Sequence, residues 1–239
     1  MTTKSNGLLI IPSKRILIVG GTSGIGAAVS RLATEASMEV VTASRRPIDE
    51  DAKPGSAHLI LDMANEAHVT ATLASCQPFD HLVVSAGGAK PAPFRGNGTA
   101  SAKQAFDTKF WGAWRVAALT PLTANASITF VSGVFAERTS PGQVAASCAN
   151  AALEALARAL AVELGPIRVN AVSPGLVDTP MWHAMPVERR NAYFASVAEK
   201  LPARGICSAD DVAALIMACV TNPALTGAVL KIDGGYTLV

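Results

Sequence analysis

Short apolar runs alternate along this chain with longer segments of helical period, and this alternation restricts the fold more than any other feature. Seven runs have the length of strands, at residues 15–19, 39–43, 58–61, 81–85, 127–132, 168–173 and 228–232. Most are nearly continuous in Val, Ile and Leu, as expected when helices cover both faces of a sheet. The pattern predicts an α/β fold, a doubly wound three-layer sandwich around a seven-stranded parallel sheet.

The segments between these runs predict the helices. The clearest covers residues 145–164, where leucines recur at spacings of three and four before the stop at Gly165 and Pro166. Residues 87–98, rich in Gly, Pro and Ala, are expected to form a loop over a site. The sequence has no linker or repeat, so residues 1–239 are expected to form one domain. The other predicted helices cover residues 25–37, 66–75, 101–119, 186–199 and 209–220.

Composition and charge argue against several classes of protein. Half of the 239 residues are apolar and 16% are charged, which suits one large buried core. The formal charge is +2 without a long basic run, so no nucleic-acid partner is expected. The apolar runs at 8–11 and 16–19 are too short for a signal peptide, and no segment is expected to span a membrane. These features predict a soluble, cytoplasmic protein.

The cysteines and histidines show no metal-ligand spacing, so no metal site is predicted. The cysteines are interpreted as buried, reduced thiols. For Cys148 the same interpretation is preferred to a nucleophile, because no histidine is positioned to activate it. The four cysteines are Cys76, Cys148, Cys207 and Cys219.

The first predicted strand leads directly into the glycine-rich segment VGGTSGIGAAVSRLA, which opens a helix. Glycines here let the backbone turn sharply and approach a pyrophosphate, whose charge the helix N-terminus favours. The position between a strand and a helix predicts a Rossmann-type dinucleotide site, with a tight turn that binds nothing as the alternative. The residues expected to contact the cofactor are Gly20, Thr22, Ser23, Gly24, Ile25 and Gly26.

The end of the second strand, TASRRP, bears on which dinucleotide is bound. In such folds the residues at this strand end contact the adenosine ribose. An acidic side chain there binds a free 2′-hydroxyl, and a cationic one binds a 2′-phosphate. Ser44, Arg45 and Arg46 offer no acid, and a guanidinium can pair with phosphate in a fork, so NADP(H) is favoured over NAD(H). The alternative is that both arginines are merely solvated. Asp62, with Met63 beside it, is a candidate contact for the adenine amino group.

Taken together, these motifs resemble the classical short-chain dehydrogenases/reductases over essentially the whole chain. The family's TGxxxGxG appears as VGGTSGIG, its NNAG as VSAG at 84–87, and IRVNAVSPGLVDTPM at 167–181 and the C-terminal LTGAVLKIDGGYTLV also match. The resemblance implies a Rossmann-type fold and places Thr179 near the nicotinamide carboxamide. It adds to the cofactor site Ser85, Ala86, Gly87, Pro174, Gly175, Val177 and Thr179.

The resemblance is weakest at the active site, where the family uses Asn, Ser, Tyr and Lys, the last two as YxxxK. NAALEALARALAVEL at 150–164 resembles the family's KAALxxLTRxLAxEL, which puts the lysine position on Asn150 and the tyrosine position on Ala146. The serine position then falls on Gly133, next to Ser132. The asparagine position, from an NxxG motif, falls on Lys109.

Reduction of a carbonyl requires a proton for the nascent alkoxide, and alanine cannot supply it. Lys109 and Asn150 look exchanged relative to the family pattern, which would keep one cation and one amide in the same pocket. Asn150 shares a helix face with Ala146 and is expected to point toward the cofactor ribose. Lys109 is hypothesised to supply charge and proton, the alternative being that it reaches solvent. Ser132 is a candidate hydrogen-bond donor to substrate, or it caps its own turn.

The segment at about 180–205 corresponds to the mobile substrate lid of the family. Its apolar residues suggest a hydrophobic substrate, although packing alone would explain them equally well. His183 and Tyr193 are the titratable groups that this lid could contribute. The apolar residues in question are Met181, Trp182 and Met185.

Three functions remain open. The first is an NADP(H)-dependent oxidoreductase that acts on a small, hydrophobic carbonyl or alcohol, with a proton route through Lys109, Ser132, Asn150 or water. The second is a non-catalytic NADP(H)-binding sensor or partner subunit. The third is an enzyme that isomerises, dehydrates or cyclises its substrate without net hydride transfer. The resemblance also implies a homotetramer or homodimer, with the helix at 145–164 in an interface.

Overall fold

A seven-stranded sheet forms the centre of the computed structural model, which describes residues 14–48, 57–88, 90–95 and 99–239. The strand order is β3-β2-β1-β4-β5-β6-β9, and every neighbouring pair is parallel. The predicted doubly wound α/β fold with a seven-stranded parallel sheet is confirmed. The strands are β1 (Arg15–Val19), β2 (Glu39–Ser44), β3 (Ala57–Ile60), β4 (Phe79–Val84), β5 (Leu122–Val131), β6 (Arg168–Pro174) and β9 (Val229–Ile232).

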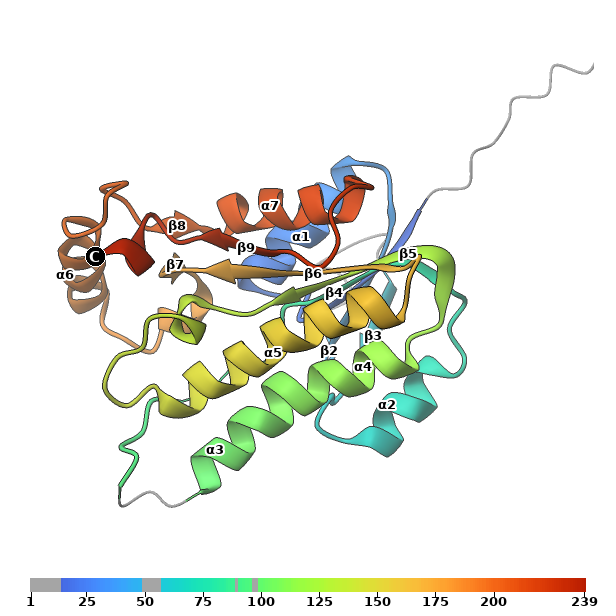
Figure 1. Ribbon diagram of the computed structural model, residues 1–239, viewed down its shortest axis with the longest axis horizontal. Coiled ribbons are helices and arrows are strands. Elements are labelled where there is room, and N and C mark those ends of the chain that lie inside the picture. Colours follow the sequence, from blue (N-terminus) through green and yellow to red (C-terminus); the bar gives the residue numbers. More distant parts are fainter. Residues whose placement is uncertain (1–13, 49–56, 89, 96–98) are drawn as a thin grey trace, which may run out of the picture.

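Helices cover both faces of this sheet (Figure 1). One layer consists of α1 (Gly24–Glu35) and α7 (Ala209–Thr221), which pack against each other. A further helix, α6 (Val187–Ala198), lies at the end of the molecule near the C-terminus (Figure 1). The opposite layer consists of α2 (Glu66–Leu73), α3 (Ala100–Ala105), α4 (Gly112–Leu119) and α5 (Val144–Glu163).

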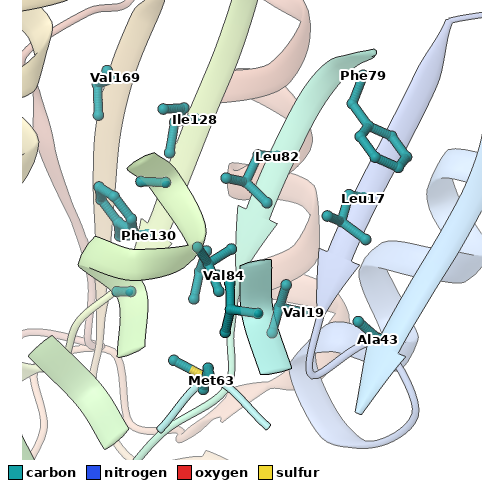
Figure 2. Close-up of a cluster of buried hydrophobic side chains, with 14 of the residues drawn as sticks. Leu17, Val19, Ala43, Met63, Phe79, Leu82, Val84, Ile128, Phe130 and Val169 are labelled. Atoms are coloured by element: carbon teal, nitrogen blue, oxygen red, sulfur yellow. The ribbon is translucent and has the colours of Figure 1, made fainter. Parts of the chain in front are cut away.

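Two apolar cores hold the layers together, because successive strand residues point to opposite faces of a sheet. Leu17 and Val19 of β1 belong to the core under α2, α4 and α5, and Figure 2 shows them beside side chains of the adjacent strands. Ile16 and Ile18 belong to the core under α1 and α7. Burial on both faces explains why the strands read as continuous apolar runs.

The helix predicted at 101–119 differs from the expectation. It divides into α3, a π-helical turn at Phe106–Trp111, and α4. A π turn inserts an extra residue into the helical repeat, and such turns are frequent at functional sites. Lys109 lies in this turn and is buried.

A small second sheet was also not predicted. The strands β7 (Val177–Asp178) and β8 (Cys207–Ser208) pair in parallel beside the main sheet. Strands of two residues are too short to show a periodicity. The pairing of β7 with β8 joins the segment after β6 to the segment before α7.

The expectation of buried thiols needs correction. The four thiols are free, and Cys207 and Cys219 are buried, but Cys148 is exposed and Cys76 is only partly buried.

Among the described residues, α5 is long and apolar enough to cross a membrane by length and composition alone. In the fold α5 contributes Leu153 and Leu156 to the core, as a packed helix of a folded domain does.

Two sequence expectations concern regions that lie partly or wholly outside the described ranges. Of the loop predicted at 87–98, the described residues contain no helix or strand, and residues 89 and 96–98 lie outside the described ranges. The apolar run at 8–11 also lies outside them.

Candidate active site and cofactor crevice

The candidate cofactor crevice is expected where the strand order reverses direction. β1 and β4 are neighbours, and the chain proceeds from them toward opposite edges of the sheet. In open parallel sheets ligands bind at the carboxyl ends of the strands at this point. Gly20 follows β1 there and Ser85 follows β4. The Oγ atom of Ser85 donates to the Val19 carbonyl at 3.2 Å, so this side chain stabilises the glycine turn that follows β1.

The glycine turn after β1 fits a pyrophosphate. Gly20 and Gly24 have φ values of +88° and +49°, which side chains rarely adopt. A Cβ atom on Gly26 would lie 2.1 Å from the Gly20 carbonyl oxygen, so only glycine can be accommodated. Ser23, the N-cap of α1, makes no side-chain capping bond, and the first turn of α1 contains no acid. The N-terminus of α1 therefore presents backbone donors to an anion.

The loop after β6 lies against the glycine turn. A Cβ atom on Gly24 would lie 3.3 Å from Thr179 Cβ, so Thr179 is adjacent to the glycine turn. The Gly175 N–H donates to the Ile232 carbonyl at 2.9 Å, which fixes the loop between β6 and β7. Val177 is buried in β7, and its carbonyl accepts from Trp182 Nε1 at 3.1 Å. Of the predicted contacts, Thr179 is thus near the turn, whereas the Val177 side chain supports the loop.

The segment just after β2 carries two exposed cations. Arg45 and Arg46 are exposed, and neither is ion-paired within the described part of the chain. Ser44 Oγ donates to the Arg46 carbonyl at 2.7 Å, and this hydrogen bond stabilises the turn after β2. His58 Nε2 lies 3.0 Å from the same carbonyl, and its Nδ1 lies 2.9 Å from Thr42 Oγ1. Sequence reasoning missed His58 because the contact joins β3 to the end of β2.

Asp62 and Met63 occupy different environments after β3. The Asp62 Oδ1 atom accepts from the Ala64 N–H at 3.1 Å, and the side chain is only partly buried. Met63 belongs to the core and meets Gly112 of α4, where a Cβ atom would lie 2.6 Å from Met63 Cε. Asp62 thus remains available to a ligand, whereas the Met63 side chain serves packing.

Lys109 points into the protein rather than into solvent. The residue is 9% exposed, and its Nζ atom donates to the Ser132 carbonyl at 3.0 Å. Burial lowers the pKa of Lys109 from 10.5 to about 8, and the Glu154 carboxylate partly opposes this shift. A Cβ atom on Gly87 would lie 3.0 Å from Lys109 Cα, so the π turn closely approaches the end of β4. The alternative in which Lys109 extends to solvent is therefore wrong.

Ser132 and Asn150 lie in the same cluster as Lys109. Asn150 Nδ2 donates to the Gly133 carbonyl at 3.3 Å, next to the Ser132 carbonyl that accepts from Lys109. The Ser132 hydroxyl donates to Glu154 Oε1 at 2.7 Å. Sequence reasoning missed Glu154, although its spacing of four from Asn150 places both on one face of α5.

The segment at 180–205, for which the sequence predicts a lid, contains an aromatic cluster. The Trp182 ring lies 5.5 Å from the ring of Tyr193 and 5.7 Å from that of Phe194, centroid to centroid. Partial burial raises the pKa of Tyr193, which favours its neutral form. His183 and Met181 are exposed. Trp182 therefore packs within this segment, whereas Met181 is exposed.

No group of three or more histidine, cysteine or acidic side chains with the arrangement of a metal site occurs among residues 14–48, 57–88, 90–95 and 99–239.

Comparison with known proteins agrees with the class that the fold and crevice define, a dinucleotide-binding α/β protein. A family profile described as enoyl-(acyl carrier protein) reductase matches residues 19–237. The chain belongs to the short-chain dehydrogenase/reductase family.

Individual relatives cover nearly the whole chain. The short-chain dehydrogenase/reductase ATR9 of Stachybotrys chlorohalonatus is 30% identical, over 95% of this chain and 98% of that protein. The cis-4-hydroxycyclohexanecarboxylate dehydrogenase of Sinomonas cyclohexanicum is 31% identical, with the same coverage of 95% and 98%.

Solved structures extend the comparison. A small-chain dehydrogenase solved in complex with NADPH has a TM-score of 0.85 at 34% identity, over 95% of this chain and 100% of that one. The MalC reductase/Diels-Alderase of Malbranchea aurantiaca has a TM-score of 0.85 at 27% identity, over 96% of this chain and 98% of that one.

Proposed function

We propose that this protein is an NADP(H)-dependent oxidoreductase that acts on a small, hydrophobic carbonyl or alcohol, with Lys109 as the proton donor. The observation that carries the proposal is the buried position of Lys109, packed against Gly87 at the crevice and bonded to Ser132. A buried ammonium with a pKa near 8 suits proton transfer near neutral pH. Membership of the family supports the redox chemistry.

Each part of the crevice has a role in this proposal. The N-terminus of α1 and the turn at Gly20 and Gly24 hold the pyrophosphate. Arg45, with Arg46 beside it, meets the 2′-phosphate, and a related structure contains NADPH. When bound, the cofactor supplies or accepts the hydride. Lys109 donates its proton to the nascent alkoxide, directly or through water, and becomes a neutral amine that is reprotonated from solvent.

A non-catalytic NADP(H)-binding role is the second candidate, and one sequence fact favours it. The α5 helix contains neither tyrosine nor lysine, and the tyrosines of the chain are Tyr193 and Tyr236. We propose that the tyrosine and lysine positions of the family fall on Ala146 and Asn150. An isomerase or cyclase without net hydride transfer is a variant of the first proposal. The reductase/Diels-Alderase among the similar structures supports keeping it.

The first test measures binding and turnover separately. NADPH fluorescence is titrated with the protein, and NADPH loss is then followed with a panel of carbonyl and imine substrates. Binding with turnover supports the oxidoreductase. Binding without turnover on any substrate supports the sensor or partner subunit, and product formation without NADPH loss supports the non-redox enzyme.

Charge reversal at Arg45 tests the cofactor assignment. Arg45→Glu is expected to raise the Kd for NADPH by about tenfold or more, because a charge-assisted fork to phosphate is replaced by repulsion. The Kd for NADH should change much less. Lys200→Glu makes the same charge change at an exposed position at the end of α6 and should alter neither value. Equal weakening of both dinucleotides by Arg45→Glu would argue against 2′-phosphate recognition.

Restoring the family's residues tests whether only the acid has been relocated. Asn150→Lys alone would place a second ammonium near buried Lys109, so the exchange is made with Lys109→Asn and Ala146→Tyr together. The triple variant should reduce carbonyl substrates about 10²-fold faster than the same protein with Ala146→Phe, which lacks only the hydroxyl. No difference between these two proteins would indicate that the pocket itself has diverged.

The remaining sequence expectations stay proposals. Residues 1–239 form one domain, in which residues 180–205 close over the substrate. A homotetramer or homodimer would cover α5 and the neighbouring α4, where Val162 is 87% exposed and Trp114 45% exposed. A cytoplasmic location and the lack of nucleic-acid and membrane partners are predictions from the sequence alone.

A further inference from the structure

Glu154 lies inside the site although no family motif marks it. It follows Ala146 and Asn150 at successive spacings of four on α5, so the three share one face of the helix. Its carboxylate extends toward the end of β5, where Ser132 and Gly133 stand. The face of α5 that has no polar side chain at Ala146 therefore carries the acidic side chain of Glu154 two turns later.

Ser132 joins Glu154 to Lys109 through two different groups. Its hydroxyl donates to Glu154 Oε1 at 2.7 Å, a short distance typical of a charge-assisted bond. Its main-chain carbonyl accepts from Lys109 Nζ at 3.0 Å. The backbone of Ser132 is itself held by the bond from its N–H to the Val172 carbonyl at 2.8 Å. Ser132, held by the backbone bond to Val172, thus fixes the positions of the Lys109 ammonium and the Glu154 carboxylate relative to each other.

The charges in this cluster depend on each other. A buried ammonium is costly unless an anion lies nearby, and Glu154 is the group whose charge favours the protonated form of Lys109. Glu154 also favours the charged form of Lys231 on β9, which is exposed and already paired with Glu137. Among the described residues, the counter-charge of Lys109 therefore comes from α5 and from no other packed element.

We propose that Glu154 is a positioning residue of the proton-donating site, which keeps Lys109 in its ammonium form and holds Ser132 beneath it. The inference rests on the proposed role of Lys109. It means that α5 supplies a negative charge to the site through Glu154, which Ala146 and Asn150 cannot do. Glu154 touches neither the cofactor nor the reacting atoms in this assignment. It acts through Lys109, whose proton is transferred to the alkoxide and is regained from water.

The titration of Lys109 tests this proposal without any substrate. Full-length protein labelled with 13C at lysine Cε is titrated by NMR, and Lys109→Met identifies the signal. Glu154→Gln removes the charge at constant shape and should lower the titration midpoint of Lys109 by roughly one pH unit, because an opposite charge is lost. Glu154→Asp keeps the charge one methylene farther away and should give an intermediate midpoint. Glu163→Gln, an exposed acid at the end of the same helix, should leave the midpoint unchanged.

The outcomes separate this inference from the proposed function. A Lys109 midpoint that is the same in wild type and Glu154→Gln would overturn the inference, whether or not the protein reduces any substrate. If Glu154→Gln does not fold, Glu154→Asp is used in its place. A Lys109 midpoint in Glu154→Asp equal to that of wild type would then overturn the inference. Should turnover be found, its decline at high pH should move to lower pH in Glu154→Gln. A shifted midpoint without turnover would retain the Glu154–Lys109 coupling and reject only the redox proposal.

Discussion

Gly26→Val is expected to abolish NADPH binding and to lower the free energy of unfolding. A Cβ atom at position 26 would lie 2.1 Å from the Gly20 carbonyl oxygen and 2.6 Å from Ser85 Oγ, so the turn must open. Opening the turn moves the N-terminus of α1 away from the pyrophosphate. The Kd for NADPH should rise by more than about 10²-fold and the stability should fall by roughly 3 kcal/mol. Fluorescence titration and urea denaturation measure the two effects.

Gly205→Ala is the matched control for this substitution. An added Cβ atom there meets one atom, the Ala203 carbonyl oxygen, at an ordinary distance of 3.9 Å, and the backbone is not left-handed. Its stability and NADPH affinity should stay close to those of wild type. If Gly26→Val bound NADPH as wild type does, the cofactor would not lie against this turn.

Lys109→Met is expected to remove most of the turnover while leaving cofactor affinity nearly unchanged. Met retains the length and apolar volume of the side chain but has no proton to donate, and loss of a positioned acid typically costs about 10²–10⁴ in rate. With a pKa of about 8, wild-type Lys109 loses its proton above that pH, so reduction should decline there. In Lys109→Met this decline should be absent from the pH profile of kcat.

The same substitution changes how stability depends on pH. The pKa of Lys109 is lowered from 10.5 in the unfolded chain to about 8 in the folded one. Between these values the unfolded chain holds more protons at this residue, so its contribution to stability increases as the pH rises. Thermal unfolding at several pH values should show this increase in wild type and a smaller one in Lys109→Met. Lys103→Met, on the exposed side of α3, should match wild type in turnover and stability. Unchanged turnover in Lys109→Met would refute its role as proton donor.

The strands and the glycine turn could be predicted from the sequence because their signals are local. Burial on both faces makes β1 and β4 continuous in apolar residues, and Gly20 and Gly26 are required by backbone geometry alone. The pairing of β7 with β8 had no such signal. It depends on contacts between segments about thirty residues apart, each too short for a pattern.

The candidate site was predictable only in part. Family resemblance predicted that Lys109 and Asn150 would lie near each other, and the structure bonds them to the carbonyls of Ser132 and Gly133. It did not indicate that the Ser132 hydroxyl points to Glu154. That orientation is decided by which acceptor lies within reach in the folded chain, and no sequence motif records it. The hypothesis that Ser132 donates to substrate therefore requires that it release Glu154 first.

The π turn at Phe106–Trp111 separates two registers of one long helical segment. One additional residue advances a helix by about 100°, so the residues before and after the turn obey different registers. Downstream, Ala113 and Val116 face the core, whereas Lys109 inside the turn faces the site. A substitution at position 109 therefore affects the site more directly than the packing of α4. Because a buried ammonium is costly without an anion nearby, an exchange of an amide for an ammonium at this position also requires an acid such as Glu154 within reach.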